Sequence, residues 1–355
     1  MDATLSIFRY SIPLTSAYVL SFGQVRSFET FYVVFRAEGR FGAGEVTPLP
    51  GYSSETPESV ARELTDLAQE LGRGRPIRDM VNGMAPRSPF AGSGVACAFE
   101  TWLSGPKAAF YSPLPLVPLA AFCAGQTPKE AASRARDLVG QGYSRLKVKV
   151  GEGPDEDLAR VRSVAAGLPE GVKVRLDANQ GYTFDQALAV CQDLEGMSAV
   201  ELLEQPFAPD RWREHENLAR KTGLPIMLDE SIWNEDDVRR ASDCGAGLVK
   251  FKLCKHLGLE GSRRMIGLAH ELGLGVVYGN GVQTALGNHL EAGLFNDAGL
   301  VLASESNGFL KTQDSPVGHR IKVRRGMLDD GGLYDLEAAF EKGALLAKAD
   351  FSHTP

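Results

Sequence analysis

Residues 145–150 read Arg145-Leu146-Lys147-Val148-Lys149-Val150, in which basic and apolar side chains alternate. Alternation with a period of two predicts a β-strand whose two faces lie in different surroundings. Short apolar runs recur along the chain, separated by segments long enough for an amphipathic helix. We predict strands at residues 117–122, 145–150, 173–177, 200–204, 225–229, 248–253, 275–279 and 300–304. This rhythm predicts an α/β fold of the (β/α)-barrel type. A doubly wound open sheet is the runner-up, but no Gly-x-Gly-x-x-Gly follows the first strand.

The residues before the barrel follow another pattern. Residues 28–35 are rich in β-branched and aromatic side chains, and Glu38-Gly39-Arg40 predicts a turn into a second strand. Helical spacing follows further along, at Val60, Leu64, Leu67 and Leu71. We therefore predict an α+β capping domain at residues 1–115 and a catalytic barrel at 116–319. Residues 320–355 or so are expected to complete the cap, with a strand at 321–323 and an alanine-rich helix at 336–348.

Composition excludes several classes of protein. The formal net charge of -7 argues against a general binder of nucleic acid or anionic membranes. The five cysteines include no Cys-x-x-Cys pair, which favours reduced thiols. Residues 1–21 lack a signal-peptide pattern, and the weakly charged segment 108–128 is interrupted by prolines. We expect a cytoplasmic protein that binds neither nucleic acid nor membrane.

Charged residues mark the ends of successive predicted strands. They lie about one βα unit apart, so they should converge at the C-terminal face of the barrel, where such enzymes keep their active sites. Two residues of one strand that are two apart point to the same side. The set consists of Lys147, Lys149, Asp177, Glu204, Asp229 and Lys252.

Three carboxylates on neighbouring strands repel one another unless a cation lies between them, and ligation by oxygen suits Mg²⁺ or Mn²⁺. The positive charge would stabilise the enediolate that forms when a carboxylate substrate loses its α-proton. The base must be a lysine that is neutral near pH 7, a form favoured by a second ammonium group nearby. Singly, each residue has a simpler interpretation, such as a solvated strand face or a helix cap. Their order and spacing favour a site.

Two other functions fit the same fold. A Schiff-base aldolase needs one buried lysine and no metal ion. A barrel that has lost catalysis could act as a binding module, although the intact set of three acids and two lysines argues against it.

The motifs resemble those of the enolase superfamily, in its muconate-lactonizing-enzyme-like (mandelate racemase/muconate cycloisomerase) family. The resemblance runs from Gly44-Glu45 to about Asp314. It implies a (β/α)7β (TIM-like) barrel with an N-terminal α+β capping domain. The matching motifs are Lys147-Val148-Lys149, Asp177-Ala178-Asn179-Gln180-Gly181, Glu204-Gln205-Pro206, Asp229-Glu230-Ser231 and Lys252-Leu253-Cys254-Lys255.

The resemblance also implies roles. The ligands of Mg²⁺ (or Mn²⁺) would be Asp177, Glu204 and Asp229. Lys149 and Lys252 would be the paired acid and base, with Lys147 touching the substrate carboxylate. Asn179 would hold one of the metal ligands in position, and Glu230 would hold Lys252 in position. Lys250 lies one step earlier on its strand and is not expected to act. The only histidine near the seventh strand, His289, falls inside the next helix and is expected in the core.

Substrate contacts are expected from both domains. The cap segment 22–26 and the loop at 48–53 should close over the barrel mouth. The candidate substrate-binding residues are Phe22, Arg26, Tyr52, Asn280, Ser304 and Glu305. Two departures from the family pattern stand out: Lys255-His256-Leu257-Gly258 replaces Lys-x-Gly-Gly, and Ser304-Glu305-Ser306 replaces the Asp-x-Asp of dipeptide epimerases.

The resemblance favours an isomerase that acts on a small-molecule carboxylate. This would be a racemase or epimerase, or a cycloisomerase, like acylamino-acid racemases or muconate cycloisomerase. The alternative is a lyase, a syn-dehydratase similar to o-succinylbenzoate synthase. The resemblance also implies a homo-oligomer, either a dimer or an octamer.

Overall fold

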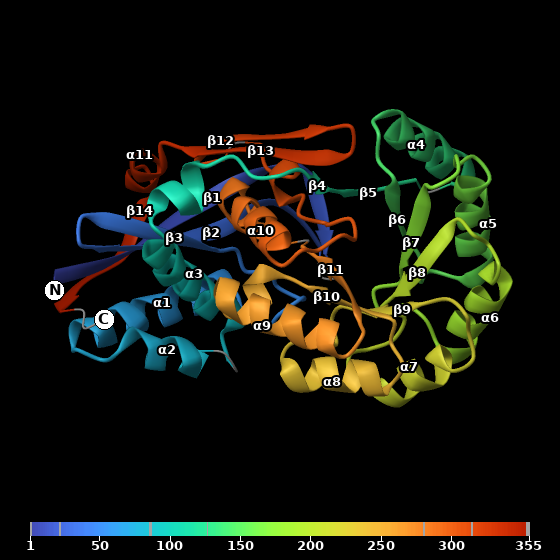
Figure 1. Cartoon of the computed structure of the whole chain (residues 1–355), viewed down its shortest axis with the longest axis horizontal. Coiled ribbons are helices and arrows are strands. Elements are labelled where there is room, and N and C mark those ends of the chain that lie inside the picture. The colour runs from blue at the N-terminus through green and yellow to red at the C-terminus, as the bar shows by residue number, and fades with distance from the viewer. Residues whose placement is uncertain are drawn as a thin grey trace.

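The computed structural model describes residues 2–20, 23–84, 87–125, 127–279, 281–313 and 315–352. Figure 1 shows a cap that holds both ends of the chain at one side and a barrel at the other. The cap sheet has the order β14-β1-β2-β3 and is antiparallel throughout. Its strands are β1 (Asp2–Leu20), β2 (Gly23–Ala37), β3 (Arg40–Val46) and β14 (Ala344–Ser352).

The helices α1 (Pro57–Gly72), α2 (Ile77–Met84) and α3 (Pro89–Ser104) belong to the cap. The turn predicted at Glu38-Gly39 joins β2 to β3, and both residues have positive φ angles of 53° and 69°, as a tight hairpin turn requires. Strand β3 lies close against α3. A Cβ on Gly44 would sit 2.0 Å from the carbonyl oxygen of Gly94, so only glycine permits this approach.

The barrel is built on a curled sheet of seven parallel strands, in the order β11-β10-β9-β8-β7-β6-β5. The strands are β5 (Ala120–Phe122), β6 (Arg145–Lys149), β7 (Lys173–Asp177), β8 (Val200–Glu204), β9 (Ile226–Leu228), β10 (Leu248–Phe251) and β11 (Gly275–Tyr278). The helices after them are α4 (Pro128–Gly140), α5 (Pro154–Ala165), α6 (Phe184–Leu194), α7 (Trp212–Ala219), α8 (Glu235–Asp243), α9 (Gly258–Glu271) and α10 (Ala285–Asp297). Figure 1 shows the helices α4 to α9 wrapped around the outside.

The eighth predicted strand, 300–304, is reduced to an isolated bridge between Leu119 and Ser304. Backbone hydrogen bonds nevertheless close the barrel at this point. The amide of Ser304 donates to Pro118 at 2.7 Å, and the amide of Glu305 donates to Tyr278 at 2.9 Å. The architecture is therefore the expected (β/α)7β barrel, with an eighth segment too short to form a regular strand.

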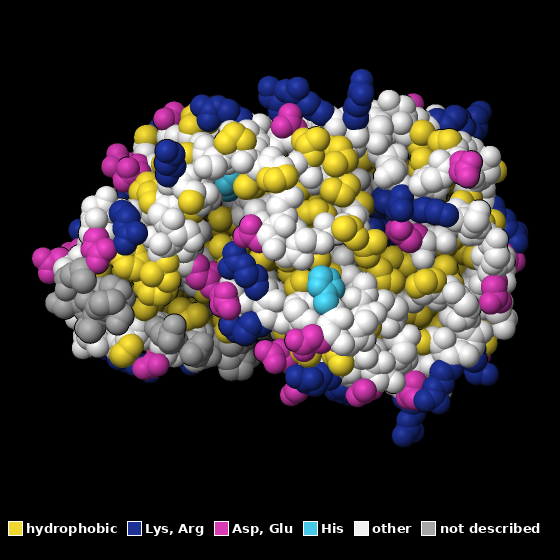
Figure 2. Space-filling model, in the orientation of Figure 1, with side chains coloured by type: hydrophobic (Ala, Val, Ile, Leu, Met, Phe, Trp, Pro, Cys, Tyr) yellow, Lys and Arg dark blue, Asp and Glu magenta, His cyan; other side chains and the backbone are white. Residues whose placement is uncertain are grey.

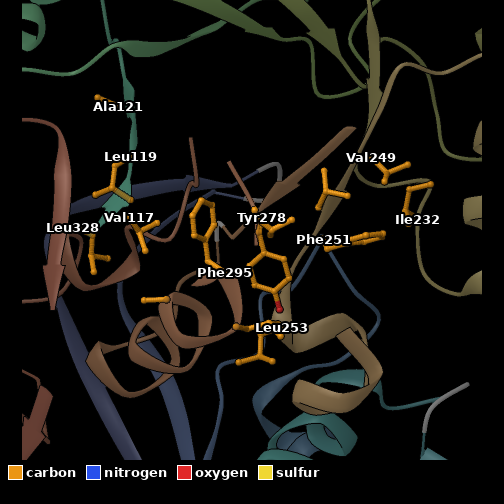
Figure 3. Close-up of a cluster of buried hydrophobic side chains, with 14 of the residues drawn as sticks. Val117, Leu119, Ala121, Ile232, Val249, Phe251, Leu253, Tyr278, Phe295 and Leu328 are labelled. Carbon is orange, nitrogen blue, oxygen red and sulfur yellow. The ribbon is translucent and has the colours of Figure 1, made fainter. Parts of the chain in front are cut away.

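The two faces of the barrel strands carry different side chains. Outward-facing residues pack under the helices, and Figure 3 shows the Tyr278 ring near Phe295 and Phe251. The Tyr278 hydroxyl reaches Ser262 of α9 at 3.1 Å. Inside the barrel, an apolar layer is formed by Leu202, Met227 and Val277 together with Leu248 and Leu302. Charged side chains occupy the positions nearer the C-terminal ends of the strands.

The last part of the chain differs from its prediction. The helix α11 spans only Leu336–Glu341, and the residues predicted to continue it form β14, which pairs with β1. The hairpin of β12 (Gly318–Arg324) and β13 (Met327–Tyr334) pairs with β4 (Val117–Pro118) and packs on α10. We propose the domain division at about residues 115 and 320 on this basis, with β14 supplying the return to the cap.

The side chain of His289 is buried in α10, away from the strand ends. Its Nδ1 lies 2.7 Å from Asp330 Oδ2, and its Nε2 lies 3.0 Å from the carbonyl oxygen of Ala109. The residue therefore ties α10 to β13 and to the chain before the barrel, as expected of a core histidine.

The surface carries charges of both signs. Figure 2 shows Lys and Arg side chains interspersed with Asp and Glu over the visible face. Among the described residues, none of the helices has both the length and the apolar character to span a bilayer.

A buried histidine predicts how stability depends on pH. His215 of α7 packs on Phe207, and burial lowers its pKa to about 4. The unfolded chain takes up this proton near pH 6.5, so stability falls as the pH drops from about 6.5 to about 4, by at most about 3 kcal/mol. His215→Phe should reduce that loss in urea unfolding measured at pH 7 and pH 4.5. An equal loss in both proteins would contradict the prediction, and His270→Gln, at an exposed position, is the control.

Candidate active site

Six predicted residues converge at the C-terminal end of the barrel. Lys147 and Lys149 lie on β6, and Asp177 and Glu204 end β7 and β8. Strand pairing places Lys149 beside Asp177 and Asp177 beside Glu204. Asp229 follows β9, and Lys252 follows β10. Five of these side chains are buried, whereas Lys149 is about half exposed.

Lysine ammonium groups join the three carboxylates. Lys147 Nζ lies 2.8 Å from Asp177 Oδ2 and 2.7 Å from Glu204 Oε2. Lys252 Nζ lies 2.7 Å from Asp229 Oδ2. The carboxylates thus share their positive partners across neighbouring strands.

Lys250, which is not expected to act in catalysis, has a structural position that its motif does not predict. Its side chain is fully buried inside the barrel, with Nζ 3.0 Å from Glu204 Oε1 and 2.7 Å from Glu305 Oε2. Lys147 also reaches Glu305, at 3.0 Å. Two lysines and two glutamates therefore form a continuous buried network, which Lys147 connects to Asp177. Lys250 points into the same barrel interior as Lys252, because the two residues are two positions apart. There it holds the carboxylate of Glu204.

The pKa values follow from this packing. Burial raises the pKa of Glu204 to about 7, helped by repulsion from Asp177 and opposed by Lys147 and Lys250. Burial would also raise the pKa of Asp177, but three lysines hold it at about 2. For Lys147, burial lowers the pKa, yet the carboxylates of Asp177, Glu204 and Glu305 raise it well above its usual value. Lys147 is therefore a permanent cation here, suited to binding an anion.

The two predicted acid/base lysines lie in different surroundings. Lys149 contacts Asp177 Oδ2 at 2.6 Å and donates to Asn179 Oδ1. Its side chain is 47% exposed, against 7% for Lys252. Lys252 lies over the ring of Tyr52, with Nζ 3.9 Å from the ring centre, close enough for a cation–π interaction.

The two predicted supporting residues contact each other. Asn179 Nδ2 donates to Glu230 Oε1 at 3.0 Å. Asn179 therefore links Lys149 to Glu230, whereas the carboxylate beside Lys252 is that of Asp229.

The predicted substrate-binding residues lie in several places. The Tyr52 hydroxyl donates to Asp229 Oδ1 at 2.8 Å, which places this cap residue at the site. Ser304 Oγ donates to the carbonyl oxygen of Tyr278 and helps to close the barrel, and Glu305 belongs to the buried network. Arg26 is exposed on β2. Phe22 and Asn280 lie outside the described residues.

Sequence reasoning missed three further cations. Lys255 Nζ reaches the Tyr52 hydroxyl at 3.0 Å and the Asp229 carbonyl oxygen at 2.8 Å, and burial lowers its pKa to about 8. Arg175 is buried and donates to Glu201 and Ala303. Lys311 donates to Gly281, and burial lowers its pKa to about 8. Arg175 could have been found, because it is two residues before Asp177 on the same strand.

The carboxylates suit a divalent cation in their chemistry. Asp177, Glu204 and Asp229 offer only oxygen atoms, from three adjacent strands, as Mg²⁺ or Mn²⁺ requires. In the described part of the chain, no three acidic, histidine or cysteine side chains already lie at metal-binding spacing. A cation would have to displace the ammonium group of Lys147, which now lies between Asp177 and Glu204. The three carboxylates therefore fit a divalent cation, and the ammonium groups beside them now neutralise their negative charge.

Comparison with known proteins identifies the family. The family model described as Enolase C-terminal domain-like matches residues 130–332, which is more than half of the chain. The chain belongs to the enolase superfamily. The model described as MenC, N-terminal domain, matches residues 3–102 in the cap. The barrel fold and cap inferred from the motifs are those of the mandelate racemase and muconate-lactonizing branch of this superfamily.

Relatives and solved structures agree with this assignment. An o-succinylbenzoate synthase from Citrobacter koseri is 29% identical over 285 residues, covering 79% of this chain and 83% of that protein. An enolase superfamily member from Roseovarius nubinhibens has a TM-score of 0.83 at 23% identity, covering 98% and 99% of the two chains. A dipeptide epimerase from Enterococcus faecalis, complexed with Mg and the dipeptide L-Leu-L-Tyr, has a TM-score of 0.82 at 22% identity, covering 98% and 100%. Both solved structures have the same fold as this chain.

Proposed function

We propose that this chain removes the α-proton of a small carboxylate with the help of a divalent cation. We further propose that the reaction is a dehydration that gives an aromatic carboxylate of the o-succinylbenzoate type. The observation that carries this choice is the difference between Lys149 and Lys252, since a dehydratase needs one mobile base and one fixed cation. A racemase needs two bases that both reach the α-carbon.

The contacts of the lysines support this distinction. Lys149 is half exposed and, among the described residues, is held by Asp177 and Asn179, so its side chain can turn toward a substrate. Lys252 is held between the Asp229 carboxylate and the Tyr52 ring. A buried ammonium with both partners in place is suited to stabilising negative charge rather than to exchanging protons.

The relatives support the same reaction. The o-succinylbenzoate synthases align with most of this chain, and a second match in the cap bears on specificity because the cap covers the barrel mouth. The solved structures of racemases and epimerases resemble it in fold alone. Racemisation of an N-acylamino acid therefore remains the second candidate. It is supported by the two lysines, Lys149 and Lys252, that lie beside the carboxylates of Asp177 and Asp229.

The chemical step needs no redox partner. The substrate would be a cyclohexadiene carboxylate with a hydroxyl group on the carbon next to the α-carbon. Lys149 takes the α-proton, and the electrons of that bond form a new ring double bond as the carbon–oxygen bond breaks. The same ammonium returns the proton to the departing hydroxide, so water leaves and the ring becomes aromatic. Lys147, whose pKa is raised well above its usual value by the surrounding carboxylates, stays charged and stabilises the substrate carboxylate together with Lys252.

Asp177, Glu204 and Asp229 would hold the divalent cation. When bound, it supplies further positive charge to the substrate carboxylate as the proton leaves. We expect Asp177→Asn to weaken Mg²⁺ binding by at least about 10–100-fold, since even loss of a supporting residue costs this much. Calorimetric titration with MgCl₂ measures it, and Asp210→Asn, an exposed aspartate, is the control. Unchanged affinity in Asp177→Asn would remove it from the ligand set.

The reaction itself is tested by product formation. The Mg²⁺-loaded chain is incubated with a hydroxycyclohexadiene carboxylate that bears a succinyl group, and o-succinylbenzoate is measured by chromatography. Appearance of the aromatic product is the expected result. Absence of product, together with racemisation of N-succinylamino acids followed by polarimetry, would replace dehydration with the second candidate.

A further inference from the structure

A pocket of about 650 Å³ lies beside the catalytic residues, outside the set of carboxylates and lysines. It is bordered by the cap, the start of α8 and the start of α9. None of Lys147, Lys149, Asp177, Glu204, Asp229 or Lys252 lines it. Its volume is in the range of pockets that hold small organic ligands. The proposed reaction leaves this pocket without a role.

One wall of the pocket is aromatic. The rings of Tyr52 and Trp233 contact each other, with centres 6.0 Å apart and a tilt of 40°. Pro89, Leu257 and Met265 add apolar surface to the lining. A flat apolar ring can bury its faces against such a lining.

Cations surround this apolar surface. Arg87 and Arg264 line the pocket with side chains 67% and 56% exposed. The ion pair of Arg264 with Glu235 is loose, at 4.0 Å, so its guanidinium can bind another anion. Lys255 supplies a third positive charge, with Nζ 4.5 Å from the Trp233 ring centre. Against these three cations the lining contains one acid, Glu235.

The pocket also contains an unsatisfied polar group. His256 lines it and is only 4% exposed, and within the described residues one ring nitrogen has at most a weak hydrogen bond to the Trp233 backbone while the other has none. Buried polar atoms nearly always have partners, so an atom without one suggests a missing ligand or water molecule. The next residue, Leu257, has a φ of 52°, a strained value for a leucine. Leu257 is also the position at which this chain departs from the Lys-x-Gly-Gly pattern, because it replaces the first glycine.

We propose that this pocket is a second binding site, for a small aromatic carboxylate. The ring would lie on the wall of Tyr52 and Trp233, and the carboxylate would bind the guanidinium of Arg264. The His256 ring would complete the polar contacts. Because Tyr52 and Lys255 also hold Asp229, an occupant would touch two residues that border the active site. The site belongs to this chain's altered loop and stands whether or not the chain is a dehydratase.

Benzoate is the probe that tests the site. The full-length, Mg²⁺-loaded protein is titrated with sodium benzoate in a calorimeter, with acetate and benzyl alcohol as probes that lack the ring or the charge. We expect benzoate to bind saturably, and we expect neither acetate nor benzyl alcohol to do so. Arg264→Ala should weaken it about five- to tenfold, because a charge-assisted hydrogen bond is lost. Ser54→Trp, at an exposed position lining the pocket, should block it.

Two control variants locate the binding. Arg263→Ala removes a neighbouring arginine that pairs with Asp297 outside the pocket and should leave benzoate affinity unchanged. Asp177→Asn alters the catalytic set and should also leave it unchanged. The proposal is overturned if benzoate does not bind at about 10 mM, a weak-binding limit. Binding that survives Ser54→Trp but is lost in Asp177→Asn would equally overturn it, by placing benzoate in the active site.

Discussion

Lys149→Ala is expected to abolish removal of the substrate α-proton, lowering its rate about 10³–10⁴-fold, the upper range for loss of a general base. Lys252→Ala should leave proton removal measurable while slowing the overall reaction about 10²–10³-fold, because it removes only a stabilising charge. The difference follows from their surroundings, since Lys149 is half exposed and Lys252 is held against the face of the Tyr52 ring. Exchange of the α-proton with deuterated solvent, followed by NMR, separates the two effects.

The control is Lys221→Ala, which removes an exposed lysine remote from the strand ends. If the chain is a racemase, the result with N-succinylamino acids has a different form. Each lysine variant would then stop exchange from one enantiomer and spare the other, because each base reaches one face of the α-carbon. Loss of all exchange in Lys252→Ala, with exchange kept in Lys149→Ala, would reverse the assignment of the base.

The position of the carboxylates could be predicted from sequence because local rules determine it. A strand predicts which side chains share a face, and the barrel places the strand ends together. Asp177, Glu204 and Asp229 each end or directly follow a strand, so their convergence needed no knowledge of distant contacts. The same reasoning found the hairpin turn at Glu38-Gly39, where two positive φ angles are required.

The contacts of Lys250 and Glu305 could not be predicted in this way. They meet only because the segment at 304–305 closes the barrel against β11 and Pro118. That segment is an isolated bridge rather than a regular strand, so its side-chain direction does not follow from alternation. Lys250 therefore seemed dispensable by motif position, although it lies at the centre of a buried ionic network.

Helix propensity misled the prediction at the C-terminus. Residues 336–348 are rich in alanine, yet the helix α11 ends at Glu341 and residues 344–352 pair with β1. An edge of the cap sheet is available at β1, and pairing with it satisfies a row of backbone groups that would otherwise be unpaired. Tertiary pairing outweighs local helix propensity, which differs among these residues by at most about 0.7 kcal/mol each, or about 1 kcal/mol for Gly343.

Lys250→Met is expected to destabilise the protein by about 3–5 kcal/mol, since it leaves buried carboxylates without one of their cations. Glu204 and Glu305 would then keep Lys147 as the ammonium group that they share, at 2.7 Å and 3.0 Å. Methionine is one atom shorter than lysine but has a similar volume, so lost volume contributes little to the change. Urea unfolding monitored by circular dichroism measures it, with Lys221→Met as the exposed control.

A second substitution tests whether charge is the cause. Adding Glu305→Gln to Lys250→Met removes the charge of one carboxylate that has lost Lys250, so the double variant should lose less stability than the two single variants together. A coupling of at least about 1 kcal/mol would be typical of residues in one ionic network. Additive losses, or a Lys250→Met variant as stable as the parent, would mean that Lys250 contributes packing alone.

Because Glu204 bonds to both Lys147 and Lys250, loss of the Lys250 ammonium group should also disturb the neighbouring carboxylates of Asp177 and Asp229. Lys250→Met should therefore weaken Mg²⁺ binding, whereas the motif-based expectation for Lys250 predicts no change.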